Sequence, residues 1–326
     1  MRVMAGDIGG TSTRLAWFDV DGATLTVRAE ARFASRDFGS LTEIVGKFIG
    51  EQRVTADRAC FGIAGPVRKG RVATPNLPWT VEGAALALTL GLPSVTLIND
   101  LESNAYGIPL LGDEDLYVLN PGQSDPEGNI AVVSAGTGLG EALVFREGDG
   151  YRPIACEAGH ADFAPRNELE TELLLWLRAE HGRVSYERVV SGPGLRNIYH
   201  FLRDGRNIPE TSAIVEDMRS GDPSAVISRA ALAGACPLCR QALDLFVSLY
   251  GAEAGNAALR YLATGGVYVG GGIAPKIIEA LKGPAFMMAF TAKGRLSPLL
   301  ESIPVKVILN DRTALLGAGR CASLDL

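Results

Sequence analysis

The sequence has few cysteines, few histidines and no excess of basic side chains. Five cysteines and three histidines are spread over 326 residues, and so sparse and odd a set of thiols argues against a disulfide framework. The 37 acidic and 31 basic side chains give a formal net charge of -6. The chain therefore has no overall positive charge that would favour binding to nucleic acid or to an anionic membrane. This charge balance is more suitable for binding a small neutral ligand.

Long apolar runs are also missing. None reaches the ~20 residues that a membrane-spanning helix requires, and the opening Met1–Ala5 meets Gly6-Asp7 too soon for a signal peptide. We therefore expect a cytoplasmic protein with no membrane partner. The spacing Cys236-Pro-Leu-Cys239 suggests a redox or zinc role, but no second ligand pair accompanies it. Because it opens an apolar helical pattern, we interpret the pair as packing.

Two common nucleotide-binding fingerprints are absent. There is no G-x-x-x-x-G-K-[ST], and no G-x-G-x-x-G that opens a helix near the N-terminus. Glycine-rich turns nevertheless follow three apolar strand patterns, at Asp7–Thr11, Gly136–Gly140 and Gly270–Gly272. Glycines after a strand let backbone N–H groups approach phosphate oxygens. The sequence predicts phosphate binding that is neither of the P-loop nor of the Rossmann type.

The opening arrangement of strand, glycine-rich turn and strand occurs twice. Gly9-Gly10-Thr11 precedes the apolar run Leu15–Phe18, and Ala135-Gly136-Thr137 precedes Ala142–Phe145. A duplicated lobe is the simplest interpretation, and a chance echo of a common pattern is the alternative. The first hundred residues alternate strand and helix patterns, whereas the middle of the chain is mostly helical in its periodicity. These patterns predict an α/β protein with a second, helix-rich lobe.

Two aspartates follow predicted strands. Asp7 ends the first strand, where a carboxylate can hold Mg²⁺ through water beside bound phosphates. Asp100 follows the buried run Val95–Ile98, at the strand end where open α/β sheets place their ligands. This position suits a general base. Asp100 could equally cap the helix that follows it, and the residues alone leave both readings open.

A third group combines a carboxylate with an imidazole. Glu157-Ala158-Gly159-His160 stands in an otherwise apolar stretch, so we expect these side chains to be partly buried. Acceptors and donors at this spacing can take two neighbouring hydroxyls of a sugar. For His160 alone a structural role is the stronger interpretation. Metal binding has less support because the other two histidines lack ligand spacing.

Taken together, the motifs resemble those of bacterial glucokinases of the proteobacterial type, within the hexokinase and actin-like ATPase superfamily. The most specific segments are 157–165 and 183–194. Gly6–Thr11 with Arg14 is similar to the first phosphate motif of the family, 136–140 to the second and 265–273 to the adenosine motif. The resemblance spans nearly the whole chain.

The resemblance implies a kinase that transfers the γ-phosphate of ATP to the 6-hydroxyl of glucose and so feeds glycolysis, with Mg²⁺, in a cytoplasmic homodimer. It implies that Asp100 takes the proton of that hydroxyl. The implied sugar-binding residues are Asn76, Asn99, Asp100, Glu157, His160 and Glu187. The implied ATP-binding residues are Asp7, which also holds Mg²⁺ through water, and Gly9, Gly10, Thr11, Gly136, Thr137, Gly138, Gly271 and Gly272.

The resemblance also implies a fold. We expect two lobes of ribonuclease H-like, actin-like ATPase ancestry around a cleft. The smaller α/β lobe would comprise 1–109 with a C-terminal helix in 303–326, and the larger, helix-rich lobe 110–302. Ala158 departs from the family pattern, which has a glycine there, and Ser12-Thr13 replaces the more usual Asn-Ala.

Other functions remain open at this level. A kinase for mannose, glucosamine or fructose would share the same carboxylates, because they do not by themselves select an epimer. A sugar sensor without catalysis is disfavoured by the intact Asp7 and Asp100. The cysteine-rich zinc motif of the related repressor-and-kinase family and a recognition helix before Val3 are both missing, which disfavours a DNA-binding regulator.

Overall fold

The chain packs into two compact units. The computed structural model describes residues 1–53, 55–74, 77–148 and 150–324. Unit 1 comprises Met1–Asp115, Glu147–Ala155 and Asn310–Leu326, and unit 2 comprises Leu116–Arg146 and Cys156–Leu309. The last segment of unit 1 begins at Asn310, later than the expected residue 303. The reason is that strand β13 (Val305–Ile308) pairs with a strand of unit 2 and so belongs to that unit.

Unit 1 is built on a five-stranded sheet in the order β3-β2-β1-β4-β7. Strand β1 is antiparallel to β2 and parallel to β4, which is in turn parallel to β7. Nearly every residue of β1 and β4 is buried, as expected for strands covered on both faces. The strands are β1 (Arg2–Ile8), β2 (Ser12–Asp21), β3 (Thr24–Ala34), β4 (Arg58–Ile63) and β7 (Thr96–Asn99).

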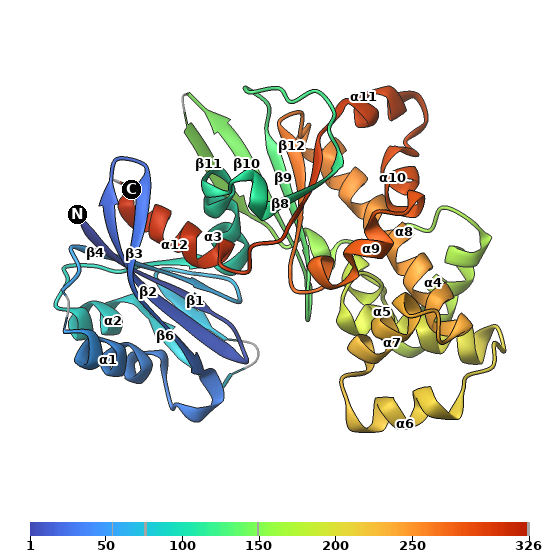
Figure 1. The fold of residues 1–326 in the computed structure, drawn as a ribbon, viewed down its shortest axis with the longest axis horizontal. Helices are drawn as coiled ribbons and strands as arrows, with labels where there is room; N and C mark the ends of the chain where they lie inside the picture. The colour runs from blue at the N-terminus through green and yellow to red at the C-terminus, as the bar shows by residue number, and fades with distance from the viewer. Residues whose placement is uncertain (54, 75–76, 149, 325–326) are drawn as a thin grey trace. The chain divides into compact units, whose positions relative to one another are not determined.

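Helices cover both faces of this sheet. Helices α1 (Leu41–Gln52) and α2 (Gly83–Leu90) pack on one face, where they meet Met4 and Ile8 of β1. On the other face, α3 (Asp100–Gly107) and α12 (Thr313–Ser323) cover Val3 and Ala5; Figure 1 shows α1 and α2 opposite α12. The alternation of a strand's side chains between two faces accounts for this double core. The remaining strands of unit 1 are β5 (Arg71–Ala73), β6 (Thr80–Glu82) and β11 (Gly150–Ala155).

Unit 2 repeats the pairing of unit 1. Its strands run in the order β10-β9-β12-β13-β8, and β9 is antiparallel to β10 and parallel to β12. The two sequence motifs that looked like copies are therefore the turns of two equivalent hairpins, β1–β2 and β9–β10. The strands are β8 (Leu116–Asn120), β9 (Ile130–Ala135), β10 (Leu139–Glu147), β12 (Gly266–Gly270) and β13.

Helices make up most of the rest of unit 2, as the periodicity predicted. The longest, α8 (Pro237–Tyr261), has buried residues along its whole length, so it forms the centre of the larger core. The others are α4 (Glu168–His181), α5 (Gly192–His200), α6 (Ser212–Ser220), α7 (Pro223–Leu232), α8 (Pro237–Tyr261), α9 (Ile278–Leu281), α10 (Pro284–Thr291) and α11 (Ser297–Ser302).

The start of α8 explains the Cys-x-x-Cys spacing. The Cys236 sulfur accepts the backbone N–H of Cys239 at 3.2 Å, so it caps the helix, and both thiols are buried. This agrees with a packing role.

Among the described residues, no single helix is both long enough and apolar enough to span a membrane. Only α7 and α8 taken together have the required length and composition, and a bend of 101° separates them.

Candidate functional site

Asp7 and Asp100 interact in unit 1. Parallel strands β1, β4 and β7 lie side by side, so the carboxyl ends of β1 and β7 share one edge of the sheet. Burial and, to a smaller extent, the negative charge of Asp100 together raise the pKa of the half-buried Asp7 to about 6, while Arg14 acts in the opposite direction. The structure thus brings together the two aspartates that the sequence singled out separately.

The helix that follows β7 is capped mainly by Asn99. Its side chain accepts the N–H of Leu101 at 2.8 Å, and Glu102 accepts the N–H of Asn99, which completes a capping box. The amide of Asn99 also donates to the carbonyl of Gly65 at 3.2 Å. Asp100 is the first residue of α3, and its Oδ1 shares the Leu101 N–H at 3.0 Å. The capping role left open for Asp100 therefore belongs chiefly to its neighbour.

Arg14, which follows the first glycine turn, is bonded to a distant segment. Its guanidinium donates to the Asp311 carboxylate at 2.8 Å and to the Asp311 carbonyl at 3.2 Å. This contact holds the pKa of Asp311 below its usual value. The turn itself is closed by the N–H of Gly9, which donates to Ser12 at 3.0 Å. Sequence reasoning did not find Asp311, because 297 positions separate it from Arg14.

Glu187 is held against the second glycine turn. Its Oε2 accepts the backbone N–H of Leu139, the first residue of β10, at 3.0 Å. A Cβ on Gly138 would lie 2.5 Å from that oxygen, so the glycine leaves room for the carboxylate. The other oxygen, Oε1, lies 3.9 Å from Nδ1 of His160. The structure thereby groups His160, Glu187 and the turn at 136–138 within unit 2.

The segment of Glu157 and His160 is more open than expected. We predicted partial burial from the apolar surroundings, but both side chains are exposed and only Gly159 is buried. The short helical turn Ala158–His160 presses Gly159 onto the carbonyl of Leu139, where a Cβ would overlap that oxygen. The backbone, rather than the side chains, is therefore the buried part. Nothing in the structure explains the alanine at 158, and Asn76 lies outside the described residues.

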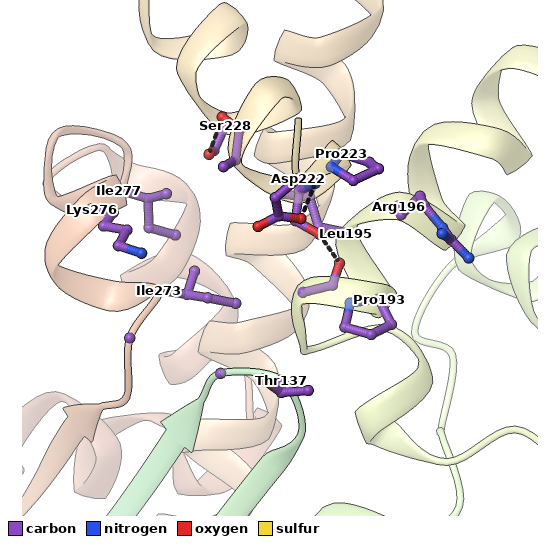
Figure 2. A pocket seen from close by; sticks show the side chains of 15 residues that line it. Thr137, Pro193, Leu195, Arg196, Asp222, Pro223, Ser228, Ile273, Lys276 and Ile277 are labelled. Atoms are coloured by element: carbon purple, nitrogen blue, oxygen red, sulfur yellow. Dashed lines mark hydrogen bonds between the residues drawn. The ribbon is translucent and has the colours of Figure 1, made fainter. Parts of the chain in front are cut away.

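A pocket of about 440 Å³ opens beside the turn at 136–138, within unit 2. Figure 2 shows it between the glycine turn, the starts of α5 and α7, and the segment after β12. Three of the residues that the sequence predicted to bind ATP line this pocket: Gly136, Thr137 and Gly272. Gly271, beside them, has a φ of +83° and packs on the carbonyl of Ala135, where no side chain fits. Gly9, Gly10 and Thr11 belong to unit 1.

Several lining residues were not foreseen from the sequence. Among them are the polar residues Arg196, Asp222, Ser224 and Lys276. The run Ser191-Gly192-Pro193-Gly194 could have indicated this wall of the pocket from the sequence. It begins α5, and its Gly192 N–H donates to the carbonyl of Gly136 at 2.8 Å. The described residues contain no cluster of three His, Cys, Asp or Glu side chains that could hold a metal.

The comparisons with known proteins agree with these features. The glucokinase family model matches residues 4–325. A glucokinase from Nostoc sp. is 43% identical over 98% of both chains. A glucokinase structure from an Antarctic psychrotroph is 32% identical, covers 98% of both chains and has a TM-score of 0.86. A glucokinase of the ROK family from Streptomyces griseus, solved with glucose and AMPPNP, is 20% identical, covers 99% of both chains and has a TM-score of 0.66.

Fold and site together define the class: a two-lobed sugar kinase with the actin-like ATPase fold, one lobe smaller and α/β, the other larger and rich in helices. The chain belongs to the glucokinase family. The resemblance carried by the sequence motifs is thereby confirmed.

Proposed function

We propose that this chain is an ATP-dependent glucokinase that forms glucose 6-phosphate and ADP. The observation that carries the proposal is the family match over nearly the whole chain, at 43% identity to a glucokinase. The geometry supports it. Glu187, on the proposed sugar side, is hydrogen-bonded to the turn that lines the proposed nucleotide pocket. This hydrogen bond thus connects a residue of the proposed sugar site to the turn of the proposed nucleotide site.

Asp100 is the proposed general base. Its carboxylate stands at the carboxyl end of β7, and a carboxylate there can accept the proton of the 6-hydroxyl as the phosphoryl group arrives. Asn99 is proposed to bind the sugar beside it, with its orientation fixed by the bonds to Leu101 and Gly65. Asn76 is proposed as a further sugar contact on the family resemblance alone.

Asp7 fits a magnesium site held through water. Carboxylate oxygens are hard ligands that suit Mg²⁺, and a cation beside Asp7 would offset both the burial and the repulsion from Asp100 that raise the pKa of Asp7. When bound, the ion would neutralise charge on the phosphates of ATP. Gly9, Gly10 and Thr11 in unit 1, and Gly136, Thr137, Gly138, Gly271 and Gly272 in unit 2, are the proposed phosphate and nucleotide contacts.

Glu157, His160 and Glu187 are proposed to bind the sugar hydroxyls. In Glu187→Gln the amide oxygen can still accept the Leu139 N–H, but the charge-assisted bond to a hydroxyl is lost. We expect KM for glucose to rise by a factor on the order of 10 while KM for ATP changes little. Steady-state kinetics with each substrate varied would measure both constants. The matched control is Glu168→Gln, an exposed glutamate in the first turn of α4; equal changes in both constants would contradict the assignment.

The location and assembly proposals rest on family resemblance. We propose a cytoplasmic homodimer that acts at the start of glycolysis. Sedimentation of the purified chain distinguishes a dimer from a 34.4 kDa monomer. A monomer at the concentrations used for kinetics would sink the dimer proposal and leave the activity untouched.

The identity of the sugar is tested with a panel of hexoses. The purified chain is incubated with Mg-ATP and glucose, mannose, glucosamine or fructose, and the products are followed by ³¹P nuclear magnetic resonance. We expect glucose to give the highest kcat/KM and the phosphate to appear on its 6-oxygen. Faster phosphorylation of another hexose would keep the mechanism and change the substrate. Phosphorylation of another hydroxyl of glucose would overturn the proposal that the 6-hydroxyl is the acceptor.

A further inference from the structure

The pocket of unit 2 contains one acidic side chain among the described residues that line it, Asp222. Asp222 precedes α7 and caps it, because its Oδ1 accepts the N–H of Ser224 at 3.1 Å. Its Oδ2 accepts no hydrogen bond from any described residue. Figure 2 shows the carboxylate directed across the pocket, towards the wall that Ile273 and Lys276 form. The cap therefore fixes the side chain and leaves one oxygen for a ligand.

The position of Asp222 along the pocket limits which ligand group it meets. Figure 2 places Thr137, in the glycine turn, at one end of the pocket and Ser228 at the other, with Asp222 between them. The glycine turn is the proposed phosphate end. In a nucleoside triphosphate the ribose lies between the phosphates and the base. Apolar side chains such as Ile277 and Leu195 also line the pocket, and they suit a purine ring.

The chemistry of a carboxylate points to the same group. An ionised carboxylate accepts hydrogen bonds and cannot donate them, and its charge repels phosphate oxygens. It therefore needs donors from the ligand. The ribose of ATP offers two neighbouring hydroxyls, and a carboxylate forms strong, charge-assisted bonds with such donors. The exocyclic amine of adenine is the competing donor.

We propose that Asp222 accepts hydrogen bonds from the 2′ and 3′ hydroxyls of ribose and so makes the chain select a ribonucleoside triphosphate. This inference rests on the proposed use of ATP. It assigns to Asp222 a role in donor specificity, separate from the phosphate contacts of the glycine turns and from the sugar contacts of Glu187.

Equilibrium binding tests this role without any sugar. Isothermal titration of the full chain with ATP, 2′-deoxy-ATP and 3′-deoxy-ATP, each with Mg²⁺, gives the ribose preference directly. We expect the chain to bind ATP about 10- to 100-fold more tightly than either deoxynucleotide, as for a hydrogen bond to a charged group. In Asp222→Ser the hydroxyl can still cap α7 but is too short to reach the ribose. We expect its preference to fall below about threefold.

A second cap serves as the matched control. Asn167 caps α4 through its side chain, which accepts the N–H of Glu170 at 3.0 Å, and Asn167→Ser should leave the ribose preference unchanged. An unchanged preference in Asp222→Ser would overturn the inference and reduce Asp222 to a helix cap. A second result would also overturn the inference: Asp222→Ser keeps the ribose preference but no longer binds ATP more tightly than inosine triphosphate. The carboxylate would then bind the base and not the ribose. A ribose preference without turnover on any hexose would sink the kinase proposal alone.

Discussion

Asp100→Asn is expected to lower kcat by a factor on the order of 10² or more, while glucose still binds. The amide keeps the size of the side chain and an oxygen that can accept the Leu101 N–H. It cannot take the proton of the 6-hydroxyl at neutral pH. The loss should therefore appear in kcat, with little change in the dissociation constant for glucose.

Two measurements separate this result from a loss of structure. Tryptophan fluorescence or calorimetry gives the dissociation constant for glucose, and the thermal midpoint of unfolding reports on the fold. Asp113→Asn, an exposed acidic side chain in the same unit, is the matched control and should keep full turnover. Near-normal turnover in Asp100→Asn would remove Asp100 from its proposed role.

A second large effect is expected at a buried acidic pair in unit 2. Glu141 of β10 and Glu253 of α8 have exposed fractions of 0%. They share one cation, because Nη1 of Arg260 lies 3.2 Å from Glu141 Oε2 and 2.8 Å from Glu253 Oε1. Burial, reinforced by the negative charge of Glu253, raises the pKa of Glu141 to about 9. Glu141 is therefore protonated in the folded chain at neutral pH.

The sign of the pH dependence follows from that shift. In the unfolded chain Glu141 ionises near its ordinary pKa of 4.5, so folding at neutral pH takes up a proton. The preference of the folded chain for protonated Glu141 therefore stabilises the fold fully below about pH 4.5. This stabilisation is lost progressively as the pH rises towards about 9, because the unfolded chain can ionise Glu141 and the folded chain cannot. One such proton changes the free energy of unfolding by up to about 1.4 kcal/mol per pH unit.

Glu141→Gln should remove this dependence, because the amide is neutral at every pH and has the shape of the protonated acid. Between pH 6 and pH 8.5 we expect the free energy of unfolding of the original chain to fall by roughly 3 kcal/mol relative to the variant. Urea unfolding of unit 2, followed at both pH values, measures the difference. Glu168→Gln provides the exposed control. Parallel pH profiles for the original chain and Glu141→Gln would show that Glu141 is ionised in the fold.

The hairpins, strand ends and glycine turns could be predicted because their signals are local. Asp7 and Asp100 each follow an apolar run, and the order of parallel strands then places both at one edge of the sheet. Gly136 and Thr137 were predicted on the same grounds. In each case a few neighbouring residues determine the backbone conformation, and the backbone conformation places the side chain.

The rest depends on contacts that the sequence does not display. The bond between Glu187 and Leu139 joins residues 48 positions apart, and that between Arg14 and Asp311 joins residues 297 apart. The role of Glu187 came only from the family resemblance. The exposure of Glu157 was predicted wrongly, because its apolar neighbours bury the backbone of Gly159 rather than the acid. Asp222 had no motif and emerged only from the pocket.

The most direct test of the central claim is the rate of ADP formation by the purified chain with Mg-ATP, with and without glucose. The proposed function predicts rapid ADP formation that requires glucose and that yields one glucose 6-phosphate per ADP. ADP formation that ignores glucose, or none with any hexose, would contradict an ATP-dependent glucokinase.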